Sequence, residues 1–248
     1  RNAVLIDGAI GVFIQIWIYF FVHDKPTPIT TTQTHNDNWL TKFMDAFFNK
    51  QTWLAGLYTA CLNLPIMILC ALWGGSYLID VHHLNPISAS NVVSLIFFGS
   101  IIGCPLLGWI SDKHGKRKPT MLWGATFTLL LVLPLMLPIK ISTISLSLIF
   151  LGLGFATSAQ VISYPLIAES NSPRNTGIAT GIASVIIMSG GGLGQLIFGN
   201  LITVNYFNNQ AVSNYKKALL IFPVSACIAL VAILIIKETY CSLQKIKN

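Results

Sequence analysis

Few side chains in this sequence of 248 residues could do chemistry, because only 9% of the residues are charged. The densest charged group is Gly108-Trp109-Ile110-Ser111-Asp112-Lys113-His114-Gly115-Lys116-Arg117-Lys118-Pro119. It places one carboxylate, Asp112, shortly before a basic pair, Arg117 and Lys118. One interpretation from composition alone is that the basic residues simply hold this segment at the cytoplasmic face by their charge.

The other reactive side chains form no catalytic or metal-binding pattern. The five cysteines are scattered without a C-x-x-C pair, and the few acids and five histidines are dispersed. We therefore expect no disulfide framework, no metal site, no cofactor and no enzymatic activity. The formal net charge of +7 would suggest nucleic acid in a soluble protein, but here it records membrane topology, and no nucleic-acid partner is expected.

Long apolar stretches must position these residues, since 54% of the chain is hydrophobic. A helix needs about 20 apolar residues to cross a bilayer. The stretches are apolar all round, whereas the strands of a membrane barrel would alternate apolar and polar residues. The sequence predicts an all-α integral membrane protein embedded in the lipid bilayer, with seven spans near residues 3–22, 53–79, 88–110, 119–139, 143–168, 176–203 and 218–236.

The basic residues predict how these spans are oriented. If the loop at 112–118 is cytoplasmic, eleven of the 15 Lys and Arg residues lie on that side. Positive residues favour the cytoplasmic side. We therefore expect the start of the chain outside and its C-terminus in the cytoplasm. The membrane is expected to be a bacterial inner (plasma) membrane.

Three segments carry more specific motifs. Residues 108–119 have the pattern G-x-x-x-D-x-x-G-x-R-K, and Glu169-Ser170-Asn171-Ser172-Pro173-Arg174-Asn175-Thr176-Gly177 places an acid, a proline, an arginine and a glycine between two spans. The span at 176–203 contains Gly190-Gly191-Gly192-Leu193-Gly194-Gln195. Together these segments resemble the major facilitator superfamily: its cytoplasmic-loop signature, its run between the tenth and eleventh helices, and its glycine-rich helices.

The resemblance implies two bundles of six helices, of which this chain holds the sixth to twelfth helices. Residues 1–22 would be the last helix of the N-terminal bundle. Residues 23–52 would be a cytoplasmic linker with a surface helix, and residues 53–248 the C-terminal six-helix bundle. A weak repeat at an offset of 215 residues, between the spans at 3–22 and 218–236, agrees with this. We expect a missing N-terminal bundle of about five spans upstream.

The resemblance also implies a cytoplasmic latch. Gly108 would let two helices approach closely, and Gly115 would allow a turn at positive φ. Asp112 would face the N-terminus of the span at 176–203, where the helix dipole favours a carboxylate. We expect Arg117 to reach Glu169, and Arg174 to reach Asp112 or Glu169. The full set predicted for the latch is Gly108, Asp112, Gly115, Arg117, Lys118, Glu169 and Arg174, and helix packing is assigned to Gly190, Gly191, Gly192 and Gly194.

The spans at 53–79 and 143–168 would line the central cavity, by the same resemblance. Polar groups at membrane depth are costly unless they face a cavity or a partner. Each could instead make a hydrogen bond between helices. The candidate substrate-binding residues are Asn63, Trp73, Tyr77, Gln160 and Tyr164, and Pro65, Gly74, Gly75 and Pro165 could bend these spans.

The resemblance therefore implies a secondary active transporter that moves a small polar organic solute or ion by alternating access, as a symporter or antiporter with a coupling ion. No carboxylate lies in the middle of any span. The alternative is a non-transporting membrane sensor or receptor on a transporter-like fold. A retinal protein would need an interior lysine in its last span, which is absent here.

Overall fold

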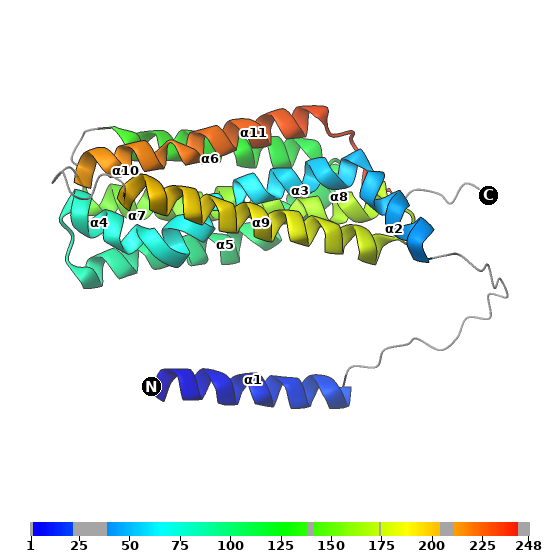
Figure 1. The fold of residues 1–248 in the computed structure, drawn as a ribbon, viewed down its shortest axis with the longest axis horizontal. Coiled ribbons are helices and arrows are strands. Elements are labelled where there is room, and N and C mark those ends of the chain that lie inside the picture. The colour runs from blue at the N-terminus through cyan, green and yellow to red at the C-terminus, as the bar shows by residue number, and fades with distance from the viewer. Residues whose placement is uncertain (1, 22–38, 138–140, 174, 204–210, 243–248) are drawn as a thin grey trace. The chain divides into compact units, whose positions relative to one another are not determined.

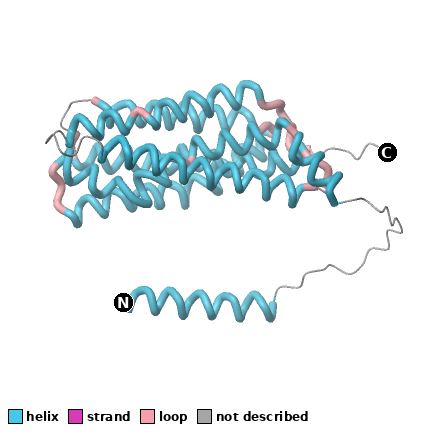
Figure 2. Tube along the Cα trace, in the orientation of Figure 1, coloured by secondary structure: helices cyan, strands magenta, loops and turns pink. Residues whose placement is uncertain are grey.

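The computed structural model describes residues 2–21, 39–137, 141–173, 175–203 and 211–242. It is helical, with no strand in these ranges. Figure 2 shows helices joined by short loops. The elements are α1 (Asn2–Phe21), α2 (Trp39–Phe48), α3 (Lys50–Leu62), η1 (Ile66–Trp73), α4 (Gly74–His82), α5 (Pro86–His114), α6 (Lys118–Met136), α7 (Thr143–Thr157), η2 (Ser158–Ile162), α8 (Ser163–Ser170), α9 (Thr176–Thr203), α10 (Ala211–Leu219) and α11 (Ile221–Ile235).

The chain divides into two compact units, Arg1–Asp37 and Asn38–Asn248. The first contains the single apolar helix α1, and the second contains all the other elements. Among the described residues, six helical segments, all in the second unit, are long and apolar enough to cross a membrane. They are Lys50–His82, Pro86–His114, Lys118–Met136, Thr143–Ser170, Thr176–Thr203 and Asn214–Ile235. The prediction of an all-α, multi-pass membrane protein is confirmed.

In the second unit the long helices run alongside one another (Figure 1). Helix α5 packs on α7, α3 packs on α9 and α11, and α6 packs on α7 and α11. Helices α4 and α10 lie at one end, and α2 lies at the other, near the start of α3 (Figure 1). The buried side chains form one core cluster around Tyr77, Phe150 and Phe222, and a second around Tyr58 and Leu166.

Several helices begin before or end beyond the predicted apolar runs because polar residues cap them. The Asn49 side chain accepts a hydrogen bond from the Gln51 N–H, so α3 begins at Lys50. The Asn85 side chain accepts from the Ser88 N–H, with Pro86 at the first helical position of α5. Both arrangements satisfy N–H groups that have no partner within the helix. The segment predicted to hold a surface helix contains α2, but the Thr-rich half of the predicted linker lies outside the described residues.

Glycine allows α5 and α7 to approach closely. A Cβ at Gly99 would collide with the carbonyl oxygen of Leu151, and a Cβ at Gly154 would collide with that of Ile96. Each helix thus presents a glycine to the backbone of the other, as small residues do in membrane helix contacts. This contact fixes α5, and with it the position of the loop that follows it.

Two spans are irregular near the prolines that the sequence predicts as bends. After Pro65, η1 is a π-helix, and it ends at Gly74, whose N–H donates to the Leu69 carbonyl. A Cβ at Gly74 would collide with that carbonyl oxygen, so glycine is needed there. Before Pro165, η2 is a 3₁₀-helix. Such irregular turns often mark hinges or functional sites.

Candidate functional site

The loop between α5 and α6 carries the charged signature. Helix α5 ends at Gly115, which has a φ of 63°, so the predicted positive φ is confirmed. Two residues later Arg117 stands at the N-cap position of α6. Its side chain turns inward and is buried, whereas Asp112 is largely exposed.

Arg117 forms a buried ion pair with Glu169 of α8. Its Nη2 lies 2.7 Å from Glu169 Oε1, and its Nε donates to the two carboxylate oxygens at 3.3 and 3.4 Å. Both side chains are only 8% exposed. The predicted contact between Arg117 and Glu169 is confirmed. Burial alone would lower the pKa of Arg117, but its hydrogen bonds to Glu169 and Asp112 outweigh burial and raise that pKa further, so the guanidinium stays charged.

Asp112 also binds Arg117, through Nη1, but its side chain is 66% exposed. The same Nη1 donates to the Ser111 hydroxyl at 3.1 Å. The resemblance placed Asp112 against Asn175 and Thr176 at the start of α9; its described contact runs to Arg117 instead. Arg117 follows Asp112 by five residues and turns its guanidinium inward beside the end of α5, so it pairs with this carboxylate. Arg174 lies outside the described residues.

Glu238 and Thr239, just after α11, complete this site. Glu238 accepts hydrogen bonds from the N–H of Arg117 at 2.7 Å and of Lys118 at 3.0 Å, so its carboxylate caps α6. The Thr239 hydroxyl donates to Glu169 Oε2. We call Asp112, Arg117, Glu169, Glu238 and Thr239 the charged cluster. It joins the α5–α6 loop, α8 and the segment after α11.

Sequence reasoning missed Glu238 and Thr239. They follow the last span directly, and the predicted topology puts them on the same side as the signature loop. That shared side was the available signal. Lys118 of the predicted latch takes part through its backbone N–H, while its Nζ donates to the Leu234 carbonyl at 3.2 Å. Gly108 differs from expectation, because a Cβ there would meet nothing within 4 Å.

Asn63 and Gln160 lie where regular helix gives way to irregular helix. Asn63 follows α3 and is buried, and Gln160 lies in η2 and is half-buried. Thr59, one turn before Asn63, donates from its hydroxyl to the Gln160 carbonyl at 3.3 Å. The structure thus brings the two segments together. Within the described ranges, neither side-chain amide has a hydrogen-bond partner, so both remain available.

Trp73 and Tyr77 differ in what their polar atoms do. The Tyr77 hydroxyl donates to the Leu135 carbonyl at 3.1 Å and lies 3.1 Å from His82 Nε2, and the residue is fully buried. The Trp73 ring packs against Phe198, and its buried Nε1 has no partner among the described residues. Tyr164 of α8 is half-buried. A substrate-binding role stays a prediction for all five candidates.

Three of the four glycines assigned to packing lie against the α3–η1 span. A Cβ at Gly190 would come within 2.8 Å of Ala60 Cβ, and one at Gly191 within 3.3 Å of Met67 Cγ. A Cβ at Gly194 would collide with the Leu64 side chain. Gly192 differs, because a Cβ there would meet no described atom within 4 Å. It lies on a different face of α9 from the other three.

Comparison with known proteins agrees with this architecture. The sequence pattern of the Major Facilitator Superfamily matches residues 1–195. The chain is 28% identical to the membrane sensor protein UhpC of Escherichia coli over 217 residues, which are 78% of this chain and 48% of that protein. It is 26% identical to the arabinose-proton symporter of Bacillus subtilis over 136 residues, 55% of this chain and 26% of that protein. The chain thus spans about half, or less, of these relatives.

Proposed function

The chain belongs to the major facilitator superfamily, and from this premise we propose that it is part of a secondary active transporter. It moves a small polar organic solute or ion across the membrane by alternating access, with a coupling ion. In this proposal residues 1–22 close the N-terminal bundle, residues 23–52 link the bundles in the cytoplasm, and residues 53–248 form the C-terminal bundle. The start of the chain faces outward in a bacterial inner membrane.

The charged cluster is the observation that carries this proposal. A buried charge pair costs several kcal/mol to separate if its members stay away from water. The cluster therefore holds one end of the unit closed through three segments distant in the sequence. A transporter that opens inward must break such contacts and re-form them when it opens outward. In this proposal the cluster acts as a cytoplasmic latch.

The irregular spans supply the second half of the mechanism. Elements η1 and η2 interrupt the two spans that carry the proposed cavity residues, so each span has a point at which it can bend. Gln195 of α9 donates from Nε2 to the Met67 carbonyl at 2.8 Å, which satisfies a backbone group within η1. In this proposal the solute binds the side-chain amides of Asn63 and Gln160 and the N–H of Trp73, which have no partner among the described residues. Tyr77 and Tyr164 are the further candidates.

Uptake by the intact transporter in proteoliposomes tests the proposal. A panel of radiolabelled sugars, organic acids and inorganic anions would be measured with and without a proton gradient. Once a solute is found, Asn63→Ala and Gln160→Ala should each weaken its apparent affinity by about tenfold, because one hydrogen bond from a buried group contributes about 1–1.5 kcal/mol. Membrane abundance should stay unchanged. Thr126→Ala, at a half-buried hydroxyl bonded within α6, is the matched control.

Unchanged uptake in both amide variants would mean that these side chains serve only helix packing. The non-transporting sensor is the alternative, since one relative is named a membrane sensor. Saturable binding of a solute without uptake under any gradient would favour the sensor over the transporter.

A further inference from the structure

Two hollows adjoin along the seam between α3 and α11. The first, about 610 Å³, is apolar and is lined from α3 by Leu54 and Leu57. From α11 its lining includes Val224, Cys227, Val231 and Ile235. The α11 residues recur at helical spacing and so form one face. This hollow is an apolar groove along the membrane-spanning part of the unit.

The second hollow, about 710 Å³, is polar and lies at the end of the same seam. Lys50 and Gln51 come from the start of α3, and Lys237 from the segment after α11. The Lys237 N–H donates to Gln51 Oε1 at 3.3 Å, which joins the two walls. Ser170 lines it as well, and its buried hydroxyl has no partner in the described part of the chain.

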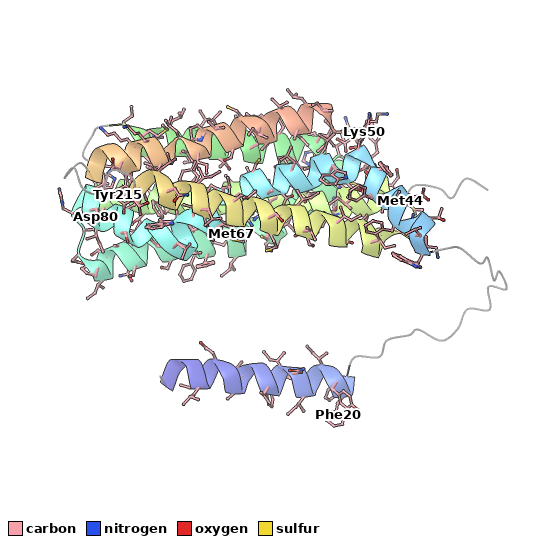
Figure 3. All side chains as sticks on the ribbon, in the orientation of Figure 1. Phe20, Met44, Lys50, Met67, Asp80 and Tyr215 are labelled. Carbon is pink, nitrogen blue, oxygen red and sulfur yellow. The ribbon has the colours of Figure 1, made fainter. Side chains whose placement is uncertain are left out.

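The two hollows follow one another along the same two walls, an apolar one and then a polar one. Lys50, Leu54 and Leu57 occupy positions i, i+4 and i+7, so they share one face of α3. On the other wall, Ile235 of the apolar groove is two residues from Lys237 of the polar hollow. Figure 3 places Lys50 at the end of the unit where α3 begins, beside α2. A ligand along these two walls would meet lysines at one end and only apolar side chains along the rest.

The charges of the polar hollow suit an anion. Its two carboxylates are already occupied: Glu169 by Arg117 and Thr239, and Glu238 by the first N–H groups of α6. Lys50 and Lys237 are exposed, and neither has a carboxylate partner among the residues described. The hollow therefore offers a ligand two exposed ammonium groups that pair directly with no described carboxylate, beside the Glu238 carboxylate that caps α6.

Aromatic residues place this hollow at the level of a membrane surface. Trp53 is exposed one turn after Lys50, and its Nε1 donates to the Phe47 carbonyl at 2.6 Å. Trp39, at the start of α2, is exposed as well. Tryptophan is enriched at the boundary between lipid tails and headgroups. In a bilayer this arrangement would bring the lysines to the level of the phospholipid phosphates and the groove to the level of the acyl chains.

We propose that the seam between α3 and α11 is a binding site for one anionic phospholipid. Its phosphate and acidic headgroup bind Lys50 and Lys237, and one acyl chain fills the groove between Leu54, Leu57 and Val231. A bound lipid here would join α3 to the segment that carries Glu238, and so would stabilise the closed charged cluster. This site is separate from the proposed cavity, and it does not depend on what the protein transports.

Native mass spectrometry of the full chain, released from detergent with added dioleoyl phosphatidylglycerol, tests the proposal. Lys50→Gln with Lys237→Gln should weaken binding of this lipid about 25-fold, since each lysine near a lipid surface contributes about fivefold. Lys113→Gln with Lys116→Gln removes the same charge from exposed positions of the signature loop and should change binding little. Val231→Trp should fill the groove and weaken binding about tenfold, whereas Val185→Trp, at an exposed valine of α9, should not.

Three results would overturn the proposal. Equal losses in the two lysine pairs would show nonspecific attraction to the basic surface. Unchanged binding in Val231→Trp would show that no acyl chain occupies the groove. Competition by inorganic phosphate as effective as that by the lipid would show a simple anion site. A thermal melt of each variant without lipid checks that the fold is intact.

Discussion

Glu169→Gln should open the charged cluster far more than Asp112→Asn, although both changes turn a carboxylate that binds Arg117 into an amide. Glu169 is 8% exposed, as is its partner, so the change leaves a buried guanidinium without its main counter-ion. Breaking a buried pair in this way costs about 3–5 kcal/mol. Asp112 is 66% exposed, and an exposed pair contributes only about 0–1 kcal/mol.

These energies predict different populations of the open cluster. A loss of about 3–5 kcal/mol raises the open-to-closed ratio by roughly 10²–10⁴-fold, whereas about 1 kcal/mol raises it about fivefold. Opening also lets water reach Arg117, so the prediction to be tested is the order of the two variants: Glu169→Gln opens the cluster more than Asp112→Asn does. Burial therefore ranks Glu169 above Asp112 within the predicted latch.

Cys241 is a built-in reporter for this opening. It is half-buried, its Sγ contacts the Ser111 carbonyl at 3.9 Å, and burial is the main cause that raises the pKa of its thiol. Opening should therefore speed its reaction with a membrane-impermeant maleimide. Glu169 and Asp112 both raise the thiol pKa through their charge, Glu169 more than Asp112, so each labelling rate is first divided by the thiolate fraction measured for that variant. The difference between the corrected rates reports the opening.

The assay uses the intact protein with Cys61, Cys70, Cys104 and Cys227 replaced by alanine. We expect the labelling rate of Cys241 to rise at least tenfold in Glu169→Gln and less than about fivefold in Asp112→Asn. Membrane abundance and gel-filtration profile serve as controls for misfolding. Equal rates in the two variants, or a larger effect of Asp112→Asn, would refute the reasoning from burial.

Three further predictions concern stability, measured as melting temperature in detergent. Gly74→Ala should lower stability by about 1–3 kcal/mol, because its Cβ meets the backbone of η1, whereas Gly75→Ala, with open space around it, should be neutral or slightly stabilising. Gly154→Ala should force α5 and α7 apart at a similar cost; Gly192→Ala is its control, and equal melting temperatures would contradict the packing argument. Glu238→Gln should cost about 0.3–2 kcal/mol through the lost charge at the start of α6, and no change would mean that this cap contributes nothing.

The membrane-spanning architecture could be predicted because bilayer physics acts on composition. Any long run without charge must be helical in lipid, so the spans are evident without knowing their partners. The positions of the irregular elements η1 and η2 could not be predicted as accurately from the sequence. Pro65 predicts a bend. A π-helix from Ile66 to Trp73, however, depends on which backbone carbonyls accept hydrogen bonds from outside the helix, as the Met67 carbonyl does from Gln195.

The residues of the charged cluster, likewise, could be predicted only in part. Arg117 and Glu169 were predictable as partners from the resemblance. Glu238 was not, since a loop sequence does not say which helix end it will meet. Gly108 and Gly192 were assigned to packing on residue type alone, yet the face that a glycine occupies depends on the rotation of its helix.

The charged cluster also has a consequence for biogenesis. Arg117 precedes Glu169 by 52 residues and Glu238 by 121. At a synthesis rate of roughly 5–20 residues per second, the first carboxylate follows about 3–10 s later, and the second about 6–24 s later. Until Glu169 has been synthesised, the arginine has only the exposed Asp112 as a counter-ion, so it must stay hydrated at the membrane surface. The segment after α11 is synthesised after both other partners of the cluster, and Glu238 then caps the backbone of α6 beside an arginine that Glu169 already pairs.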